Sequence, residues 1–279
     1  MLYRLSDRSS EEWYDAIDAH LSSAFSAALC FAPSAGWHED GRFTRFVSGV
    51  PDPFGNIVWN ARLHETGIDG EIGRILDPIV SRDVPGIWIV GPTSEPAGLK
   101  ERLLAAGLVP GPGMEAMAVD LDRVAEAPMP DGVLLEEVCD DAAMSAWIEV
   151  LAAGYEIAPE VAAAFGCWPR HLGYSSRSKM RAFLAREGAR PVACSLVYLH
   201  DGVAGIYCVA TAPGARRRGI GRAMTVAPLL EARAAGYRTA VLQASAAGES
   251  IYRRIGFDSF GPIAMMVRLP ADAQGAAIH

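Results

Sequence analysis

The feature of this sequence that most constrains its fold is a pattern that runs twice along the chain. Gly107-Leu108 follows an amphipathic helical segment and precedes a strand, and Gly256-Phe257 stands in the same setting in the second half. The strands that follow these pairs also resemble each other, with MAVDL at 117–121 and MMVRL at 265–269. Similarity in the same order indicates an internal duplication. Two unrelated α/β domains are the alternative interpretation.

A linker separates the two halves. The stretch AEAPMPDG at 125–132 contains two prolines, a glycine and two acidic residues, and it has no apolar periodicity. A chain of 279 residues is long enough for two domains of ordinary size. The sequence therefore predicts domains at 1–126 and 127–279.

Helices and strands alternate in both halves, which predicts an α/β (α+β) fold. In the first half, helices are predicted over 9–29, 68–80 and 97–106, and strands over 43–50, 56–63, 86–90 and 114–121. In the second half, strands are predicted over 133–138, 179–186, 191–200, 203–211, 239–244 and 263–269, and helices over 140–153, 159–165, 219–235 and 249–255. Asp201-Gly202 is a hairpin signal between two of these strands.

Composition excludes several classes of protein. The net charge of −8 opposes general binding to nucleic acid or to an anionic membrane, so any phosphate site must be local. The five cysteines are odd in number and show no CxxC pair, which favours a reducing compartment over a disulfide framework. The absence of a signal-like segment and of a long apolar run makes a cytoplasmic location the expectation.

The segment Val209–Thr225, VATAPGARRRGIGRAMT, joins a strand to a helix through a loop rich in arginine and glycine. Amides in the first turn of a helix have no partner within the helix, and the helix dipole adds positive charge there. Glycine lets the backbone approach a phosphate closely. The segment therefore predicts a pyrophosphate site, and a solvated basic patch is the alternative.

This segment resembles the signature [Q/R]-x-x-G-x-[G/A] of the GNAT superfamily of acyltransferases at Arg216, Gly219 and Gly221. The family's second signature, a helix bearing Y-x-x-x-G-F, is matched at 252–257. The resemblance covers 133–269 in the family's strand order, and the first half resembles a degenerate copy. It implies two tandem GNAT-like domains, each with a mixed, mostly antiparallel sheet flanked by helices.

The resemblance also implies a site for acetyl-CoA as co-substrate. The residues expected to contact it are Val209, Ala210, Thr211, Arg216, Arg217, Arg218, Gly219, Ile220, Gly221, Arg222 and Ser245. The strand residues would bind the pantetheine arm through their backbone, and the loop would hold the pyrophosphate. Tyr252 would lie near the thioester sulfur as the catalytic residue, where a phenol can supply a proton to the departing thiolate. A core aromatic is the alternative for Tyr252.

The general base is not identified from the sequence. Some members of the family carry a catalytic glutamate at positions aligned with Gly205 and Ala240, and neither residue here can accept a proton. Other acidic or basic groups in the helical region near the expected acceptor site are Glu149, Glu156, Glu160 and His171. Each of these is expected on the solvated surface, and a water chain is an equal alternative.

The first half departs from the signature where its own cradle should be. Asp69 and Glu71 replace the arginines and would repel a pyrophosphate, and Leu103 replaces the tyrosine. We therefore expect no CoA site there. A metal site is not expected either, since Pro169 separates Cys167 from His171 and no further ligand cluster is visible.

Taken together, these observations predict an acetyl-CoA-dependent N-acetyltransferase that moves an acetyl group to a primary amine by direct transfer in a ternary complex. The expected acceptor is a small molecule, with no nucleic-acid or membrane partner, and the chain is expected to be a monomer or homodimer. The alternative is a non-catalytic acyl-CoA-binding sensor or assembly subunit. Nucleic-acid binding through Arg216–Arg218 is a weaker reading, which the net charge opposes.

Overall fold

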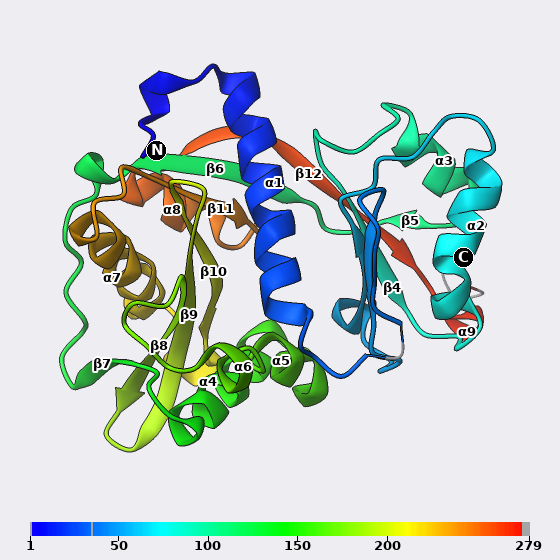
Figure 1. Ribbon diagram of the computed structural model, residues 1–279. Coiled ribbons are helices and arrows are strands. Elements are labelled where there is room, and N and C mark those ends of the chain that lie inside the picture. The colour runs from blue at the N-terminus through cyan, green and yellow to red at the C-terminus, as the bar shows by residue number, and fades with distance from the viewer. Residues whose placement is uncertain (1, 35, 275–279) are drawn as a thin grey trace. The chain divides into compact units, whose positions relative to one another are not determined.

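The computed structural model describes residues 2–34 and 36–274, and it divides the chain into two compact units. Unit 1 combines the residues up to Phe31 with Glu115–Gly261, and unit 2 combines Ala32–Met114 with the residues from Pro262 onward. Figure 1 shows the elements of each unit. Both units consist of a mixed, mostly antiparallel sheet flanked by helices, which confirms the predicted fold class.

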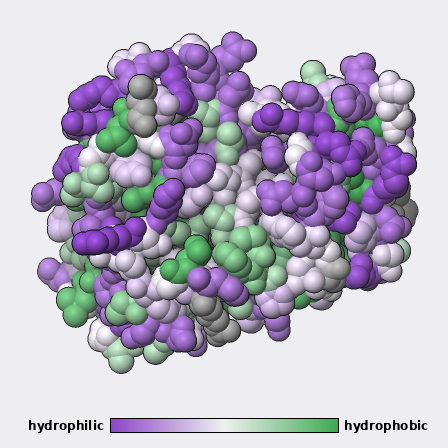
Figure 2. All heavy atoms as spheres, viewed as in Figure 1, coloured by the Kyte–Doolittle hydropathy of each residue, from purple (hydrophilic) through white to green (hydrophobic). Residues whose placement is uncertain are grey.

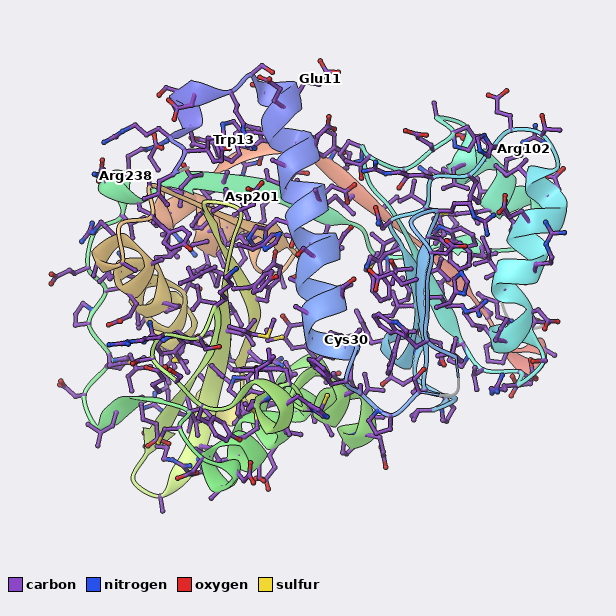
Figure 3. The ribbon with its side chains drawn as sticks, viewed as in Figure 1. Glu11, Trp13, Cys30, Arg102, Asp201 and Arg238 are labelled. Carbon is purple, nitrogen blue, oxygen red and sulfur yellow. The ribbon has the colours of Figure 1, made fainter. Side chains whose placement is uncertain are left out.

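The sheet of unit 1 has the strand order β6-β11-β10-β9-β8-β7. Its strands are β6 (Met114–Asp120), β7 (Val133–Glu137), β8 (Met180–Glu187), β9 (Arg190–His200), β10 (Val203–Thr211) and β11 (Thr239–Ala244). Only β10 and β11 run parallel. The predicted hairpin joins β9 to β10, where Asp201 and Gly202 both have positive φ, of 44° and 77°. Figure 3 labels Asp201 at this turn.

The helices of unit 1 are α1 (Ser10–Leu29), α4 (Asp141–Tyr155), α5 (Pro159–Phe165), α6 (Pro169–Leu172), α7 (Ile220–Ala234) and α8 (Glu249–Ile255). Of these, α1 and α4 begin at side-chain caps, Ser9 and Asp140. The Glu12 N–H donates to the Ser9 hydroxyl at 3.2 Å, and the Ser9 N–H donates to the Glu12 carboxylate at 2.7 Å, so two end groups are satisfied together. Figure 3 labels Glu11 at the start of α1 and Cys30 after its end.

Two helical layers cover opposite faces of this sheet, because consecutive strand residues point to opposite sides. Ile206 of β10 lies in a core shared with Met224 of α7 and Ile255 of α8. The next residue, Tyr207, contacts His20 of α1. Helix α5 packs against both α1 and α4, so these three helices form the second layer. Figure 1 shows α1 running beside β10 and β11.

Unit 2 has a smaller sheet in the order β1-β2-β3-β4-β12, with β5 also paired to β12. The strands are β1 (His38–Glu39), β2 (Thr44–Val47), β3 (Asn56–Trp59), β4 (Gly86–Val90), β5 (Val109–Pro110) and β12 (Asp258–Arg268), of which residues 262–268 belong to this unit. The helices are α2 (Ile68–Val80), α3 (Leu99–Ala105) and α9 (Ala271–Gln274). Trp88, Ile72 and Leu103 lie in its buried core.

The two units do not coincide with the predicted division at 126 and 127, and the reason is backbone pairing. The last strand of the first half, β6, pairs antiparallel with β11 of the second half. The last strand of the second half, β12, pairs antiparallel with β4 of the first. Each of the two similar segments, at 117–121 and 265–269, therefore pairs with a strand from the other half of the sequence. Helix α1 belongs to the first half of the sequence but packs against β10, β11 and α5 of unit 1.

Most predicted elements are present, and the differences lie at ends and in short segments. β12 begins at Asp258, before the predicted 263, and α4 continues to Tyr155, beyond the predicted 153. The short elements β1, β5, α6 and α9 have too few residues to show a periodicity. Gly107 and Gly256 follow α3 and α8 with φ of 87° and 116°, as expected of residues that end helices.

The pairing of β6 with β11 predicts that residues 127–279 do not fold when expressed alone. This fragment lacks both α1 and β6, so one edge of β11 and the part of the sheet face that α1 covers would be exposed to water. Size-exclusion chromatography and near-ultraviolet circular dichroism of the fragment should show aggregation or loss of fixed tertiary structure. The control is the full chain, and cooperative unfolding of the isolated fragment near the full chain's midpoint would contradict the prediction.

Candidate functional site

The centre of the candidate site is a split between the two parallel strands of unit 1. Pairing between β10 and β11 is limited to Ala204 with Ala240 and Gly205 with Val241. Both strands continue, to Thr211 and Ala244, but no further facing pairs occur along the described residues of this strand pair. Backbone N–H and C=O groups that lack a partner in the sheet form hydrogen bonds with other groups. The split can therefore bind an extended ligand through its backbone.

A β-bulge in β10 bends the strand at this split. The register with β9 passes from Tyr207 opposite Leu196 to Ala210 opposite Cys194, so Cys208 and Val209 together face a single residue. Cys208 has φ of 51°, a left-handed conformation that costs a non-glycine residue of the order of 1–3 kcal/mol. Such strain is characteristic of functional positions. The predicted contact residues Val209, Ala210 and Thr211 all lie at or after this bulge.

The loop after β10 is shaped by two residues with positive φ. Arg217 has φ of 64° and Gly219 has φ of 84°, and α7 begins immediately after at Ile220. Gly219 is the N-cap and provides no side chain to the first turn of the helix. Ile220 is buried in the core and fixes the helix start against the sheet. The first-turn amides of α7 are thus set beside the end of β10, where an anion would be stabilised.

The predicted arginines have different surroundings. Arg216 donates to the carbonyls of Thr211 at 3.1 Å and Gly154 at 2.9 Å, so it ties the end of β10 to the end of α4. Arg218 forms an ion pair with Glu187 at 2.6 Å. In the described part of the chain, no side-chain hydrogen bond or ion pair occupies Arg217 or Arg222. These two guanidinium groups remain available for a phosphate.

Tyr252 lies on α8 and packs against the core on the α7 side of the sheet. Its ring meets that of Phe257 edge to face, with ring centroids 6.0 Å apart. A Cβ at Gly248 would lie 2.8 Å from the Tyr252 ring, so glycine there makes room for it. Burial raises the pKa of Tyr252 to about 12. The phenol therefore keeps its proton at neutral pH and can donate it.

Tyr155, a residue that the sequence did not single out, approaches the split from the opposite helical layer. It is the last residue of α4 and is 46% exposed as a whole. Burial of the phenol raises its pKa well above the usual value, and the nearby Cys208, Tyr252 and Cys194 raise that pKa further. Gly154 permits the approach, because a Cβ there would lie 2.7 Å from the Cβ of Ala210. Phenols from both layers thus converge on the bulge. No sequence signal marks Tyr155 apart from its place before a helix end.

The remaining predicted site residues lie in exposed positions. Ser245 follows β11, and its carbonyl accepts the N–H groups of Gly248 and Glu249 at the start of α8. The candidates for a general base, Glu149, Glu156, Glu160 and His171, are all exposed, as expected of solvated residues. Figure 2 shows hydrophobic residues over α5 and α6, where Leu172 is 52% exposed. His171 stacks on Phe31 there, with ring centroids 4.5 Å apart.

Helix α1 places a buried histidine, His20, against strand β10. His20 is 5% exposed, and its Nδ1 lies 2.7 Å from the hydroxyl of Tyr207. Gly205, one of the positions expected to hold a glutamate in some relatives, cannot take a side chain here. A Cβ at Gly205 would collide with the Tyr207 ring and lie 2.5 Å from His20 Cε1. The sequence pattern did not find this pair, because α1 was assigned to the other domain.

In unit 2, the start of α2 takes the place that the start of α7 has in unit 1, and its residues differ. Helix α2 follows Gly67, which has φ of 77°, and its first turn carries Asp69 and Glu71. Glu71 pairs with Arg42, and Leu103 is fully buried. Across residues 2–34 and 36–274, no group of three or more potential metal ligands is present. No helix within those residues is long and apolar enough to span a bilayer.

Comparison with known proteins gives a family match for part of the chain. Residues 178–259, which run from just before β8 into β12, match the model of the acetyltransferase (GNAT) domain. No protein of curated function matches the sequence.

Solved structures resemble the chain over most of its length. A GCN5-related N-acetyltransferase from Kribbella flavida is 18% identical, with 90% of this chain and 95% of that chain covered and a TM-score of 0.65. A tandem GNAT protein from the clavulanic acid biosynthesis pathway is 15% identical, with coverage of 96% and 97% and a TM-score of 0.59. A GCN5-related N-acetyltransferase from Sphaerobacter thermophilus is 16% identical, with coverage of 81% and 76% and a TM-score of 0.59.

Residues 178–259, which contain the split strands, the bulge and the loop that ends at Gly219, match a GNAT acetyltransferase domain, and the chain as a whole has the fold of tandem GNAT proteins.

Proposed function

We propose that this protein is an acetyl-CoA-dependent N-acetyltransferase that acetylates a primary amine, with a small molecule as the acceptor. The observation that supports the proposal most strongly is the split between β10 and β11 beside the open first turn of α7. The two features stand next to each other along one chain segment, and together they suit a ligand with an extended arm and a pyrophosphate. The coarser activity, acetyl transfer, is that of the family that the domain matches.

The residues present fit acetyl-CoA. Arg217 and Arg222 have free guanidinium groups, and Gly219 leaves the first turn of α7 without a side-chain cap. A Cβ at Gly221 would lie 3.4 Å from the Thr211 hydroxyl, so glycine keeps the passage between strand and helix open. These groups would hold the pyrophosphate, and the backbone of Val209 to Thr211 would hold the pantetheine arm. Ser245 would contact CoA beyond the end of β11.

Acetyl-CoA supplies the activated acetyl group as a thioester. The bulge turns backbone groups near Val209 toward the split, where an N–H can stabilise negative charge on a carbonyl oxygen. Burial raises the pKa of Tyr252 to about 12, so its phenol is protonated at neutral pH and can donate a hydrogen bond that stabilises the departing thiolate. The amine then attacks the carbonyl directly in a ternary complex: the C–N bond forms, the C–S bond breaks, and the proton that the amine loses passes to water.

A non-catalytic acyl-CoA sensor or assembly subunit is the second candidate. It is favoured by one observation, the absence of a carboxylate at Gly205 and at the fully buried Ala240. Turnover separates the two candidates. A sensor binds acetyl-CoA and releases no CoA thiol when amines are added, whereas an acetyltransferase releases it. The cytoplasmic location and the monomeric or homodimeric state remain part of the proposal.

Isothermal titration should show acetyl-CoA binding at one site per chain, because unit 2 presents Asp69 and Glu71 at the start of α2. Replacing Gly221 with valine should abolish this binding, since the side chain would enter the space between Thr211 and α7. The matched control is Gly73→Val in α2, where an added Cβ has no neighbour within 4 Å. Unchanged affinity in a folded Gly221→Val variant would refute the cradle.

Charge removal at Arg217 or Arg222 should weaken acetyl-CoA binding by about tenfold to a hundredfold for each residue, as expected for a lost charge-assisted hydrogen bond. The same titration measures this effect. Arg238→Ala is the control, since Arg238 precedes β11 and therefore lies at the opposite end of the parallel pair from the loop. Equal losses in Arg217→Ala and Arg238→Ala would point to a general charge effect.

Tyr252→Phe should keep acetyl-CoA affinity and lower turnover by about a hundredfold, since it removes the proton donor and preserves the ring. Release of the CoA thiol with a thiol reagent measures the rate. Tyr237→Phe provides the comparison, because Tyr237 packs against the same core and follows α7. A Tyr252→Phe variant with the wild-type rate would leave Tyr252 as a packing residue only.

A further inference from the structure

The buried pair His20–Tyr207 has a defined direction of hydrogen bonding. His20 Nε2 lies 3.4 Å from the carbonyl oxygen of Val203, and a carbonyl can only accept. Nε2 therefore carries the ring proton, and Nδ1 accepts the hydroxyl proton of Tyr207 at 2.7 Å. Burial lowers the pKa of His20 to about 4, so the ring is neutral at physiological pH and this arrangement persists.

The direction of that bond determines what Tyr207 can do. Its one hydroxyl proton is committed to His20, so the lone pairs of Oη remain as acceptors. Tyr207 is half-buried as a whole, and burial of its phenol raises the pKa well above the usual value. It stands between Gly205, the last residue paired with β11, and the bulge at Cys208. A group that donates an N–H can therefore be held beside the split at this point.

The surrounding rings keep the pair in place. Tyr198 lies edge to face with His20 at a centroid distance of 5.5 Å, and His200 stacks on Tyr198 at 5.3 Å. The Tyr198 hydroxyl lies 3.3 Å from the Ser23 hydroxyl, so it is occupied by another residue of α1. The rings of Tyr207 and His20 fill the space over Gly205, where a side chain would otherwise lie. Rotation of either the imidazole or the phenol would thus require displacement of packed rings.

Tyr207 lies on the face of the sheet from which we expect the acceptor amine to approach, opposite the face covered by α7. The open start of α7 and Tyr252 belong to one helical layer, and Val209 packs into that layer's core. Tyr207 projects to the opposite face, under α1. Tyr207 is the one aromatic residue of β10, and it lies on the side from which a nucleophile would approach a carbonyl held in the split across this second face.

We propose that Tyr207 accepts a hydrogen bond from the N–H of the acceptor amine and that His20 is the positioning residue that orients it. The assignment rests on the proposed function. An amine held through one N–H keeps its nitrogen lone pair free for attack. The N-terminal helix then contributes to acceptor binding in unit 1, although it belongs to the first half of the sequence.

The experiment compares Tyr207→Phe with wild type on a fixed panel of tyramine, spermidine and glucosamine, using the amine that wild type turns over fastest. The amine KM should rise about tenfold, as for one lost hydrogen bond, with acetyl-CoA affinity by calorimetry unchanged. Tyr198→Phe is the matched control, because Tyr198 lies in the same ring cluster and is occupied by Ser23. It should keep the wild-type KM.

A double-mutant cycle separates positioning from packing. His20→Phe should raise the amine KM, and His20→Asn, whose amide oxygen can accept the Tyr207 hydroxyl proton, should recover part of the loss. Because His20 acts through Tyr207, the double variant His20→Phe/Tyr207→Phe should have the KM of Tyr207→Phe alone. Additive losses, or losses that appear equally in acetyl-CoA affinity, would indicate a structural role and overturn the assignment.

The outcomes for the two proposals differ. If wild type acetylates an amine and Tyr207→Phe has the same KM, the role of Tyr207 is refuted while the acetyltransferase function stands. If wild type binds acetyl-CoA and acetylates none of the amines, the proposed function fails, and the role of Tyr207 fails with it. Nitrogen-15 NMR of the imidazole in wild type should show the Nε2–H form of His20, and the Nδ1–H form would also overturn the assignment.

Discussion

The candidate site depends on the early end of one parallel strand pairing. β10 and β11 face each other at two positions only, and the strands then diverge. Had the ladder continued, the backbone groups of Val209 to Thr211 would be satisfied within the sheet and unavailable to a ligand. The bulge at Cys208 maintains the divergence, because an extra residue bends β10 and raises its local twist. The positions of Tyr252, Tyr155 and Tyr207 matter because all three lie around this opening.

The four arginines of the segment from the end of β10 to the start of α7 show that residue type alone does not define a role. Arg216 acts as a tie between β10 and α4, and Arg218 is occupied by Glu187. The groups left for a phosphate are Arg217, whose backbone adopts a strained conformation, and Arg222 in the first turn of α7. In a protein of net charge −8, the local excess of positive charge is therefore smaller than the sequence suggests.

Local signals in the sequence predicted most of the helices and strands. Ser9, Asp201-Gly202 and Gly256 each determine a cap or a turn through interactions with near neighbours, so a short window is sufficient. Helical periodicity shows which face of α1 is apolar but not which sheet it covers, and so His20 was not placed beside Tyr207. The bulge at Cys208 carries no glycine to mark it. The exchange of β6 and β12 depends on pairing between distant segments, which no local pattern encodes.

The exchanged strands also bear on how the chain is made. β4 receives its partner β12 only after residues 262–268 have been synthesised, and at 5–20 residues per second that takes roughly ten seconds or more after β4 itself. Throughout this interval the hydrophobic strand GIWIV keeps one edge unpaired. Folding of unit 2 on the ribosome therefore cannot be completed domain by domain from the N-terminus. The nascent chain has an exposed edge that a chaperone, or another copy of the chain, can bind first.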